Sequence, residues 1–549
     1  MTDVKKYITG LIKNSFPEID SEISFDIPKD LNHGDLTSNI ALVFSKKAGK
    51  KPRDFATEII NTLSFDKNII SKVEIAGPGF INFFISEDYY RNILNDILNI
   101  KSEFGKSDLN KNKTANLEWV SANPTKPLHA GHGRQICLGK AIANLLEWTG
   151  YKVTREYYYN DAGNQMNKLA ESVYARYMQI INPEFPFPED GYHGDYIKNI
   201  ASLIYEMRKD SLKDKFDDEE TKEFFKTAGE NFNFKIIRNT LNKLGIHHDI
   251  FFNESDLYNN GEIKNLIEEF KNRKIAYEKE GAVWLKMEES EGFDKDKVIV
   301  KSSGEPTYRL PDMAYHIDKI KRGYDLILDI FGSDHGDTYK EVLYGVKKAG
   351  YDISNIKVII HQMVTFKMGN ESVKMSGRSD TSYYLDELID DIGADATQFF
   401  FVMRGANTHL DFDIKLAKEQ SDKNPVYYLQ YAYARICGIF RNAENEFKEL
   451  ISDEFNPSVL TDENEINLLK TLSRFPDEVE DSTRTFEPHK IITYLNKVAS
   501  DFHTFYHNNR VLDAEQPEQS KARLKLADAT RIVLKNGFDI IGISSPERM

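Results

Sequence analysis

Apolar and polar positions follow three different patterns along the chain. Up to about residue 100, helical spacing mixes with strand-like stretches, and residues 73–85 place β-forming side chains on both sides of a Gly-Pro-Gly turn. Residues 115–150 predict a strand, a proline-containing loop and a helix from about His132, with apolar side chains every three or four positions. Short strands are expected at 282–301, DLILDIFG and VIIHQMV, and from about residue 386 the pattern is helical almost without interruption.

This order of elements predicts a multidomain α/β protein. A chain of 549 residues is too long for one hydrophobic core. We expect an N-terminal α+β domain at 1–112, a Rossmann-like domain with a parallel sheet at 113–385, and an all-helical domain at 386–549. Residues 170–275 are charged, predict mostly helix and carry no recognisable motif, so we expect a connective insertion there, within the middle domain.

Composition narrows the class of protein. Apolar residues make up 40% and charged residues 29% of the chain, as in ordinary globular proteins, and no apolar run approaches the ~18 residues of a membrane-spanning helix. The first twenty residues do not resemble a signal peptide. The two cysteines, Cys137 and Cys437, are far apart, which excludes a disulfide framework and speaks against a cysteine-built zinc site. We therefore expect a cytoplasmic protein without a membrane partner.

The net charge of −15 speaks weakly against a nucleic-acid partner. Binding to RNA requires only a local basic surface, however, and two stretches could supply one, residues 46–53 and residues 521–535. A solvated charged face explains each stretch equally well. Charge alone therefore leaves the question open.

The strongest local motif is His129-Ala130-Gly131-His132, between the predicted strand and helix. Two imidazoles three positions apart at the start of a helix face the same side, where backbone N–H groups and the positive end of the helix dipole also point. This arrangement suits the phosphates of a nucleotide, and Gly131 leaves room for a flat base close to the backbone. Two surface histidines beside a helix start are the alternative, and a zinc site would lack an evident third ligand.

A second motif lies some 240 residues further along the chain. Residues 364–375 alternate around Gly369-Asn370, which predicts a β-hairpin, and a loop rich in Ser, Gly and Arg follows. Lys374 and Arg378 on that loop could hold a pyrophosphate as negative charge moves onto it. A basic surface loop is the alternative interpretation.

The two motifs, in this order, resemble the signature pair of the class I aminoacyl-tRNA synthetases. The longer string ANPTKPLHAGHGR resembles the arginyl-tRNA synthetases in particular, as do YYYNDAGNQ, YRLPDMAYH, NPVYYLQYAYARI and the terminal GISSPERM. These segments follow the order of that family from the N-terminal unit to the last residue. The resemblance implies a ligase that activates L-arginine with ATP and transfers it to the 3′-terminal adenosine of tRNA(Arg) in protein biosynthesis.

The resemblance also implies roles for individual residues in the ATP site. His129 and His132 would stabilise the pentavalent phosphate in the transition state, and Lys374 would be the catalytic lysine of the loop. Gly131, Met375 and Ser376 would complete the site around ATP. Mg²⁺ is expected to arrive with ATP rather than in a protein-built metal cage.

The chain departs from the class pattern at two positions. Ala130 replaces the usual isoleucine, which should be harmless. Gly377 stands where a second lysine is usual, so one positive charge of the phosphate site is missing. By resemblance Lys126 is the candidate to supply that charge, which puts the role of Arg378 in doubt.

Recognition of arginine requires paired acceptors, because a guanidinium presents five donors in a fixed fork. The resemblance implies an arginine site that comprises Glu118, Asn123, Tyr308, Asp312 and Asp334. Asn123 would hold the end of the substrate that carries the α-amino and carboxylate groups. Three of these residues could instead have a purely structural role: Glu118 as an exposed strand position, Asp312 as a helix N-cap and Tyr308 in core packing.

The flanking domains are expected to bind the tRNA. The resemblance implies that the N-terminal unit contacts the tRNA elbow through Phe80 and Asn82. The helical domain would read the unstacked bases of the anticodon. Its candidate residues are Tyr431, Arg435, Tyr506 and Met549. Helix packing explains the tyrosines as well, a helix-surface charge explains Arg435, and a frayed chain end explains Met549. A monomer is the default expectation.

Three other functions compete with this interpretation. A synthetase of the same class specific for lysine is the nearest, since Glu118 and Asp312 would suit any cationic substrate. Small nucleotidylyltransferases share the H-x-G-H motif, but they lack the second motif and a helical C-terminal domain of more than about 150 residues. A non-catalytic tRNA-binding relative would have no need of His129, His132 and Lys374.

Overall fold

Five parallel strands form the sheet at the centre of the molecule in the computed structural model, which describes residues 3–28, 31–161, 164–369, 371–373 and 383–549. Their order is β11-β10-β4-β5-β6. They are β4 (Thr114–Glu118), β5 (Lys152–Tyr159), β6 (Ile250–Asn253), β10 (Leu326–Gly332) and β11 (Ile356–His361). The strand order reverses between β4 and β10, and ligands of open α/β sheets bind beyond the carboxyl ends of the strands at such a switch point. The expected Rossmann-like sheet is confirmed.

Helices cover both faces of this sheet. Side chains alternate between the faces along each strand, so Leu117 and Glu118 point in opposite directions. Leu117 packs in the same apolar cluster as residues of α5 (Gly133–Trp148), whereas Glu118 is hydrogen-bonded to α11 (Arg309–Lys321). The two helices that matter most for the site therefore lie on opposite faces.

The expected insertion at 170–275 contains two kinds of structure. Three helices, α6 (Asn164–Ile181), α7 (Asp195–Arg208) and α8 (Glu219–Lys243), form a lobe with an apolar core of its own. Residues 250–253, in contrast, form the edge strand β6 of the central sheet. A run of three apolar residues followed by Asn253 carries too little periodicity to separate a strand from a helix, which explains why the sequence did not reveal this strand.

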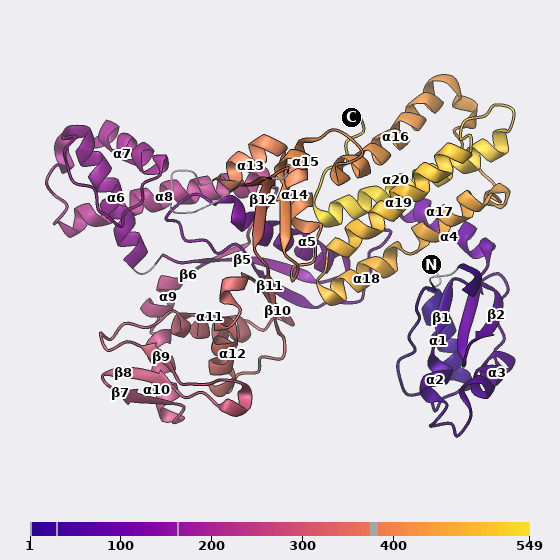
Figure 1. Cartoon of the computed structure of the whole chain (residues 1–549), viewed down its shortest axis with the longest axis horizontal. Coiled ribbons are helices and arrows are strands. Elements are labelled where there is room, and N and C mark those ends of the chain that lie inside the picture. The colour runs from indigo at the N-terminus through magenta and orange to yellow at the C-terminus, as the bar shows by residue number, and fades with distance from the viewer. Residues whose placement is uncertain (1–2, 29–30, 162–163, 370, 374–382) are drawn as a thin grey trace.

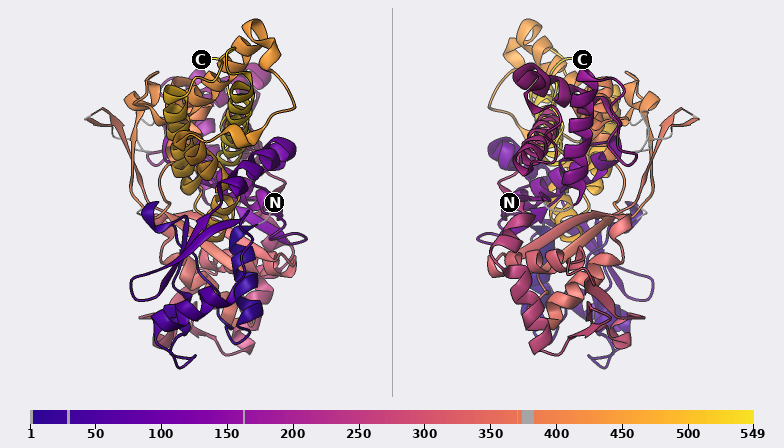
Figure 2. Two further views of the ribbon diagram at one scale, coloured as in Figure 1. Left: turned by 90° about the vertical axis from the view of Figure 1, so that its right-hand side faces the viewer. Right: turned by 90° about the vertical axis from the view of Figure 1, so that its left-hand side faces the viewer.

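A smaller subdomain is built from the part of the sequence between β6 and β11. Its antiparallel sheet consists of β7 (Ala276–Lys279), β8 (Ala282–Leu285) and β9 (Lys297–Val300), in that order. Around it pack α9 (Glu254–Asn259), α10 (Glu262–Asn272), α11 and α12 (Thr338–Lys348). Figures 1 and 2 show this subdomain and the N-terminal unit below the central sheet, with the α6–α8 lobe and the C-terminal helices above it.

The N-terminal unit is the expected α+β structure. An antiparallel sheet in the order β1-β3-β2 is covered by helices. Its elements are α1 (Val4–Ser15), β1 (Leu36–Ser38), α2 (Ile40–Phe44), α3 (Pro52–Thr62), β2 (Ile70–Ala76) and β3 (Phe80–Ile85). The next helix, α4 (Glu87–Ile100), packs on the C-terminal helices α17 and α20 and so joins this unit to the rest of the molecule.

The predicted hairpin near the second motif is present. Strands β12 (Val364–Met368) and β13 (Glu371–Val373) pair antiparallel, and Gly369 adopts the left-handed backbone conformation of the turn with φ +67°. β12 also pairs in parallel with β14 (Leu410–Asp413). The prediction of almost uninterrupted helix from residue 386 is wrong at β14, because its pairing partner lies 46 positions earlier and local pattern cannot reveal it.

The C-terminal part is otherwise helical. Its helices are α13 (Leu385–Ile392), α14 (Ala394–Val402), α15 (Ile414–Lys418), α16 (Pro425–Glu446), α17 (Glu463–Ser473), α18 (Phe475–Thr485), α19 (His489–Asn508) and α20 (Pro517–Ile541). α5 packs against α14, α18 and α20, so the helix behind the first motif is also part of the C-terminal packing.

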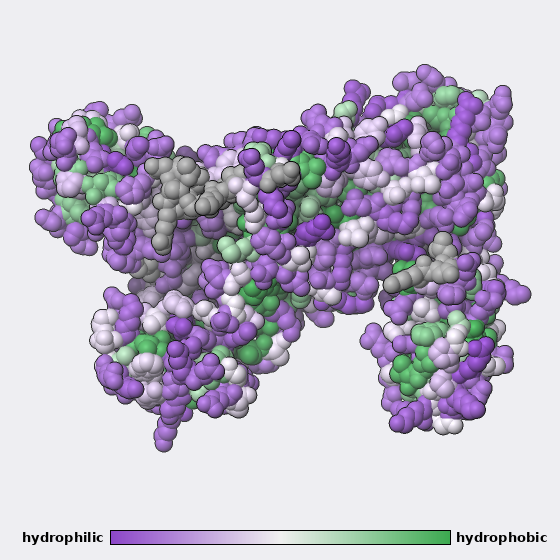
Figure 3. Space-filling model, viewed as in Figure 1, coloured by the Kyte–Doolittle hydropathy of each residue, from purple (hydrophilic) through white to green (hydrophobic). Residues whose placement is uncertain are grey.

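Figure 3 shows a mostly hydrophilic face with small hydrophobic patches. No helix in the described ranges has the length and apolar character needed to cross a bilayer.

Candidate active site

The first motif forms a compact turn at the start of α5. His129 precedes the 3₁₀ turn Ala130–His132, and the two imidazole centroids lie 3.7 Å apart. The backbone N–H of His129 donates to Nδ1 of His132 at 3.2 Å. Because Nδ1 accepts this bond, neutral His132 carries its proton on Nε2, so Nε2 is its hydrogen-bond donor toward a ligand.

Both imidazoles are neutral near pH 7. Burial, followed by the charge of Lys126, lowers the pKa of His129 to about 4. Burial, followed by His129 and Lys126, lowers the pKa of His132 to about 3. The histidines therefore offer N–H donors to a phosphate, and Lys126 is the neighbouring cation.

Gly131 is required by the packing of the motif itself. A Cβ at this position would lie 2.8 Å from both Cε1 and Nδ1 of His129. Any larger residue would therefore displace the His129 ring. The glycine was expected to make room for a base, and the structure adds this second reason.

The chain that follows the second motif lies directly against the first motif. The Ala130 N–H donates to the carbonyl of Tyr383 at 3.0 Å, and the Leu385 N–H donates to the carbonyl of Leu128 at 2.8 Å. His129 and Tyr384 form an antiparallel bridge. The candidate ATP-binding residues Lys374, Met375 and Ser376 lie outside the described residues, as do Gly377 and Arg378.

Arg134 ties the first turn of α5 to the segments around the β12–β14 sheet. Its guanidinium is fully buried and donates to the carbonyls of Gln362 at 2.8 Å, Gly405 at 2.8 Å and Thr408 at 2.7 Å. Burial without a bonded carboxylate lowers the pKa of Arg134 to about 10. The helix that carries both histidines is thereby held to the sheet that carries the hairpin before Lys374.

A row of buried carboxylates crosses the central sheet next to this turn. Glu118 on β4 is directly opposite Glu156 on β5 and Asp329 on β10, and the three side chains face α11. Like charges on directly opposite strand positions destabilise a sheet. The row can therefore be buried only if cations neutralise it.

Helix α11 supplies those cations from one face. Lys319 Nζ donates to Glu118 Oε2 at 2.5 Å and to Asp329 Oδ1 at 2.6 Å. Arg322 donates to both oxygens of Glu156 at 2.6 and 2.8 Å. Burial lowers the pKa of Lys319, but Asp329 and Glu118 outweigh it and leave the pKa above its ordinary value, so the ammonium stays charged.

His316 and Tyr315 complete the neutralised row. His316 Nε2 lies 3.1 Å from Asp329 Oδ2, and its Nδ1 lies 2.8 Å from the carbonyl oxygen of Asp312. Tyr315 donates to Glu156 at 2.8 Å. We use the name α11 stripe for Asp312, Tyr315, His316, Lys319 and Arg322. Asp312, His316 and Lys319 share one face of α11 because they are spaced by four and three positions, Tyr315 lies beside His316, and Arg322 is the C-cap residue three positions after Lys319.

Asp312, at the start of the stripe, lies outside this row, and among the described residues no cation is hydrogen-bonded to its carboxylate. Burial raises its pKa to about 7, and nearby Glu118 and Glu254 act in the same direction against His316. Glu254 accepts a hydrogen bond from Tyr158 at 2.9 Å, and burial raises its pKa as well. Two neighbouring carboxyl groups with raised pKa values mark a place where a cation is expected to bind, because a cation would stabilise their ionised forms.

The structure contradicts the particular structural alternatives that the sequence suggested for three of the arginine-site candidates. Glu118 is 4% exposed and is not a surface residue of its strand. Asp312 lies inside the first turn of α11, whose N-cap is Tyr308. Tyr308 is 59% exposed, so it is not core filler. Glu254 was missed, because the strand that it follows, β6, was not recognised.

The remaining candidates lie around the same edge of the sheet. Asn123 donates to Gln165 Oε1 at 2.8 Å, which links the loop after β4 to the first turn of α6. Asp334 follows β10 and is highly exposed, 3.7 Å from His335. Within the described ranges no three His, Cys, Asp or Glu side chains are grouped to hold a metal ion.

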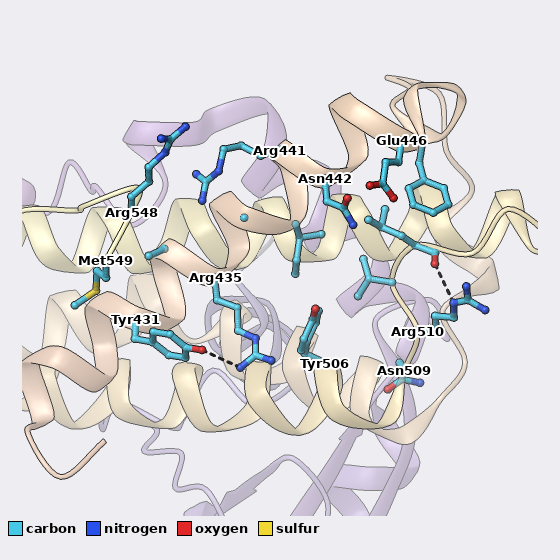
Figure 4. A pocket seen from close by; sticks show the side chains of 16 residues that line it. Tyr431, Arg435, Arg441, Asn442, Glu446, Tyr506, Asn509, Arg510, Arg548 and Met549 are labelled. Carbon is cyan, nitrogen blue, oxygen red and sulfur yellow. Dashed lines mark hydrogen bonds between the residues drawn. The ribbon is translucent and has the colours of Figure 1, made fainter. Parts of the chain in front are cut away.

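The C-terminal candidates converge on one cavity. Tyr431, Arg435, Tyr506 and Met549 line a hollow of about 890 Å³ between α16, α19 and the chain end (Figure 4). The Arg435 guanidinium lies 4.7 Å above the Tyr506 ring, and its Nη1 lies 3.4 Å from the Tyr431 hydroxyl. The cavity also contains residues that the sequence did not single out, namely Arg441, Asn442, Asn509, Arg510 and Arg548.

The two tRNA-binding candidates in the N-terminal unit differ in their exposure to solvent. Phe80, at the start of β3, is 38% exposed and can meet a partner. Asn82 is 4% exposed and lies between its strand neighbours Thr37 and Glu74. Its side chain is therefore not presented to a partner in this structure.

Comparison with known proteins relates the chain to one family. The family model described as "tRNA synthetases class I (R), catalytic domain" matches residues 93–401, "Arginyl tRNA synthetase N terminal domain" matches 2–85, and "DALR anticodon binding domain" matches 429–549. Arginine–tRNA ligase of Chlorobaculum parvum is 45% identical over 550 residues, covering 99% of each chain, and that of Desulfotalea psychrophila is 44% identical over 527 residues, covering 95% of this chain and 94% of the relative. The structure of Thermus thermophilus arginyl-tRNA synthetase shares the fold over 100% of both chains, with a TM-score of 0.78 and 19% identity.

The neutralised row predicts a large stability effect at Lys319. Lys319→Met leaves Glu118 and Asp329 buried without their shared cation, and breaking a buried ion pair in this way costs about 3–5 kcal/mol of unfolding free energy. We expect a clear fall in the midpoint of thermal unfolding, and partial recovery in the double variant with Asp329→Asn. Lys321→Met, at an exposed pair with Glu262, should cost less than about 1 kcal/mol. A Lys319→Met midpoint equal to that of the wild type would contradict the network.

Proposed function

This chain belongs to the arginyl-tRNA synthetase family, and we propose that its central site joins L-arginine to the α-phosphate of ATP and then passes the arginyl group to the 3′-terminal adenosine of tRNA(Arg). The protein is a ligase with ATP as a substrate. The observation that carries the proposal for this site is that two features meet at the carboxyl edge of one sheet. One is the turn at His129–His132, whose donors suit a phosphate, and the other is the pair Asp312 and Glu254, whose carboxyl groups have raised pKa values and no hydrogen-bonded cation among the described residues.

The turn before α5 binds the triphosphate in this proposal. His132 donates from Nε2, His129 lies beside it, Lys126 adds positive charge, and Gly131 keeps the two rings together. Family resemblance assigns Lys374, Met375 and Ser376 to ATP as well, and Tyr383 and Leu385, which follow them in the sequence, are hydrogen-bonded to this turn. The reaction requires in-line placement and stabilisation of charge on phosphate rather than proton transfer. Mg²⁺ enters with ATP, coordinated mainly by phosphate oxygens.

The carboxylate cluster binds the side chain of arginine. Asp312 and Glu254 provide acceptors for the guanidinium, and Tyr308 covers it from the exposed side. Glu118 contributes its charge, although Lys319 and Ser121 already occupy hydrogen-bonding positions on its two oxygens. Asn123 and Asp334 lie toward the end of the substrate that reacts. Lys319 and Arg322 of the α11 stripe bind Glu118, Asp329 and Glu156, so a bound guanidinium would supply the positive charge beside Asp312.

This arrangement favours arginine over lysine. An ammonium can satisfy fewer of the surrounding acceptors than a guanidinium with its five donors in a fixed plane. Buried acceptors left without donors make discrimination strong, on the order of 10⁴-fold in comparable sites. A lysine-specific enzyme would also have little need of the additional acceptor at Glu254.

The flanking parts hold the tRNA in this proposal. The cavity of Tyr431, Arg435, Tyr506 and Met549 receives an anticodon base, because stacked aromatic rings and guanidinium groups suit unstacked bases. Arg441, Arg510 and Arg548 add positive charge around it. The N-terminal unit contacts the tRNA elbow through Phe80, whereas the buried Asn82 supports its strand and reaches a base only if that strand moves.

In this proposal residues 1–112 bind the tRNA elbow, residues 113–385 carry out catalysis, and residues 386–549 form the stem and bind the anticodon. We place the reaction in the cytoplasm, where two buried, unpaired cysteines suit a reducing environment. The protein works as a monomer in this proposal, since one chain contains every residue assigned above.

Charging of total tRNA with labelled amino acids tests the function. The wild type should charge tRNA with arginine and not with lysine. His132→Ala removes a donor aimed at the reacting phosphate and should lower the charging rate about 10²–10³-fold. His193→Ala, at an exposed loop position in the α6–α8 lobe, should leave the rate unchanged. Lysine charging by the wild type, or full activity of His132→Ala, would overturn the assignment.

The raised pKa of Asp312 predicts how arginine affinity depends on pH. Below about pH 7 a proton occupies the carboxylate that arginine needs, so KM for arginine should rise up to about tenfold per pH unit on acidification and level off above pH 7. The check is ATP–pyrophosphate exchange with tRNA present, between about pH 5.5 and 8.5. Asp312→Asn should bind arginine weakly at every pH and show a flatter profile. A wild-type KM that does not change with pH would contradict this role.

A further inference from the structure

The last turn of α20 is held by the helix that carries the histidine motif. Asn144 on α5 donates to the carbonyls of Asp539 and Ile540 at 3.0 and 3.1 Å, and Gln398 on α14 donates to that of Ile541 at 2.9 Å. The last carbonyls of a helix have no partner within the helix. Here Asn144 of the catalytic part and Gln398 of α14 provide those partners for the longest C-terminal helix.

Lys140 is the centre of this junction. Its ammonium donates to the carbonyl of Gly542 at 2.8 Å and to that of Leu244 at 2.7 Å. Gly542 follows α20 and Leu244 follows α8, so the charge lies at the negative ends of two helix dipoles. A Cβ at Gly542, where φ is +82°, would lie 2.6 Å from Lys140 Cε, so the approach requires glycine.

The chain beyond Gly542 leads directly into the C-terminal cavity. The Ser544 N–H donates to Asp395 Oδ1 at 2.9 Å, and the same carboxylate accepts from Gln430 of α16 at 2.7 Å. Arg441 then donates to the carbonyl of Glu547 at 3.0 Å. The last residues line the cavity, as Figure 4 shows. The tail 542–549 is therefore attached at both ends, to the catalytic helices and to the cavity wall.

We infer that Lys140 is a positioning residue that transmits the seating of this tail in the anticodon cavity to the histidine motif. Lys140 lies eight positions after His132, about 12 Å along α5. Its two bonds restrict how α5 slides or turns relative to α20 and α8. A base bound in the cavity stabilises the tail, the tail holds Gly542, and Gly542 holds α5 where its first turn meets ATP. This inference rests on the proposed function, since the cavity must receive a tRNA base.

Lys140→Met tests the inference, since it keeps the stem and removes the donor. We expect kcat of arginine charging to fall about tenfold, because small misplacement of reacting groups lowers the rate, while KM for arginine stays within about twofold. Lys140→Arg retains donors and should recover part of the rate. Lys497→Met, which removes a lysine from an exposed pair on α19, is the matched control and should behave as the wild type. An unchanged kcat in Lys140→Met would overturn the inference.

A double-mutant cycle separates transmission from a purely structural role. Deletion of Arg548 and Met549 should lower kcat in the wild type but cause little further loss in Lys140→Met, because both changes act through one connection. Losses that multiply would show independent effects and overturn the inference. If Lys140→Met does not fold, Gly542→Ala replaces it in the cycle, since its Cβ displaces the same ammonium. A wild type that does not charge tRNA with arginine would instead refute the proposed function itself.

Discussion

The structure depends on the neutralisation of three carboxylates that are buried side by side on three parallel strands. Glu118, Glu156 and Asp329 could not occupy adjacent positions of one sheet without the α11 stripe. Lys319 and Arg322 therefore determine how α11 lies on the sheet. That placement leaves Asp312 near Glu118 and Glu254, and within the described ranges no cation is hydrogen-bonded to the Asp312 carboxylate. The arginine site is, in this account, the unneutralised end of a structural ion network.

The other face of the sheet is organised by α5. Its first turn presents the histidines, Arg134 holds that turn to the segments around the β12–β14 sheet, and Lys140 holds its middle to the ends of α8 and α20. A single helix thus contacts the histidine motif, the segments around the β12–β14 sheet and the C-terminal helices. Under the proposed function, misplacement of this helix would affect catalysis more than binding of arginine, because the proposed arginine site lies on the opposite face of the sheet.

Features encoded in contiguous residues could be predicted from the sequence. The β4–loop–α5 unit, the hairpin at β12–β13 and the long C-terminal helices follow from local periodicity and turn residues. β6 and β14 could not be predicted, because each is a four-residue strand whose pairing partner lies 94 or 46 positions earlier in the chain. The equally short strands β8 and β9 were expected, and they pair with each other within one local sheet. The residues of the α11 stripe look like an ordinary charged helix in sequence. Their partners Glu118 and Glu156 lie more than 150 positions earlier in the chain.

The site residues were also predicted to different degrees, because some belong to one contiguous motif and others depend on contacts between distant parts of the chain. The histidines and Lys126 could be placed from one motif, and family resemblance singled out Asp312. Glu254 required the three-dimensional contact with Tyr158, and Asn82 turned out to be buried.

The most direct test of the account is a crystal structure with arginine and a non-hydrolysable ATP analogue. The account predicts the guanidinium within hydrogen-bonding distance of Asp312, with the bonds from Lys319 to Glu118 and Asp329 intact. A guanidinium remote from Asp312, or a displaced Lys319, would contradict it.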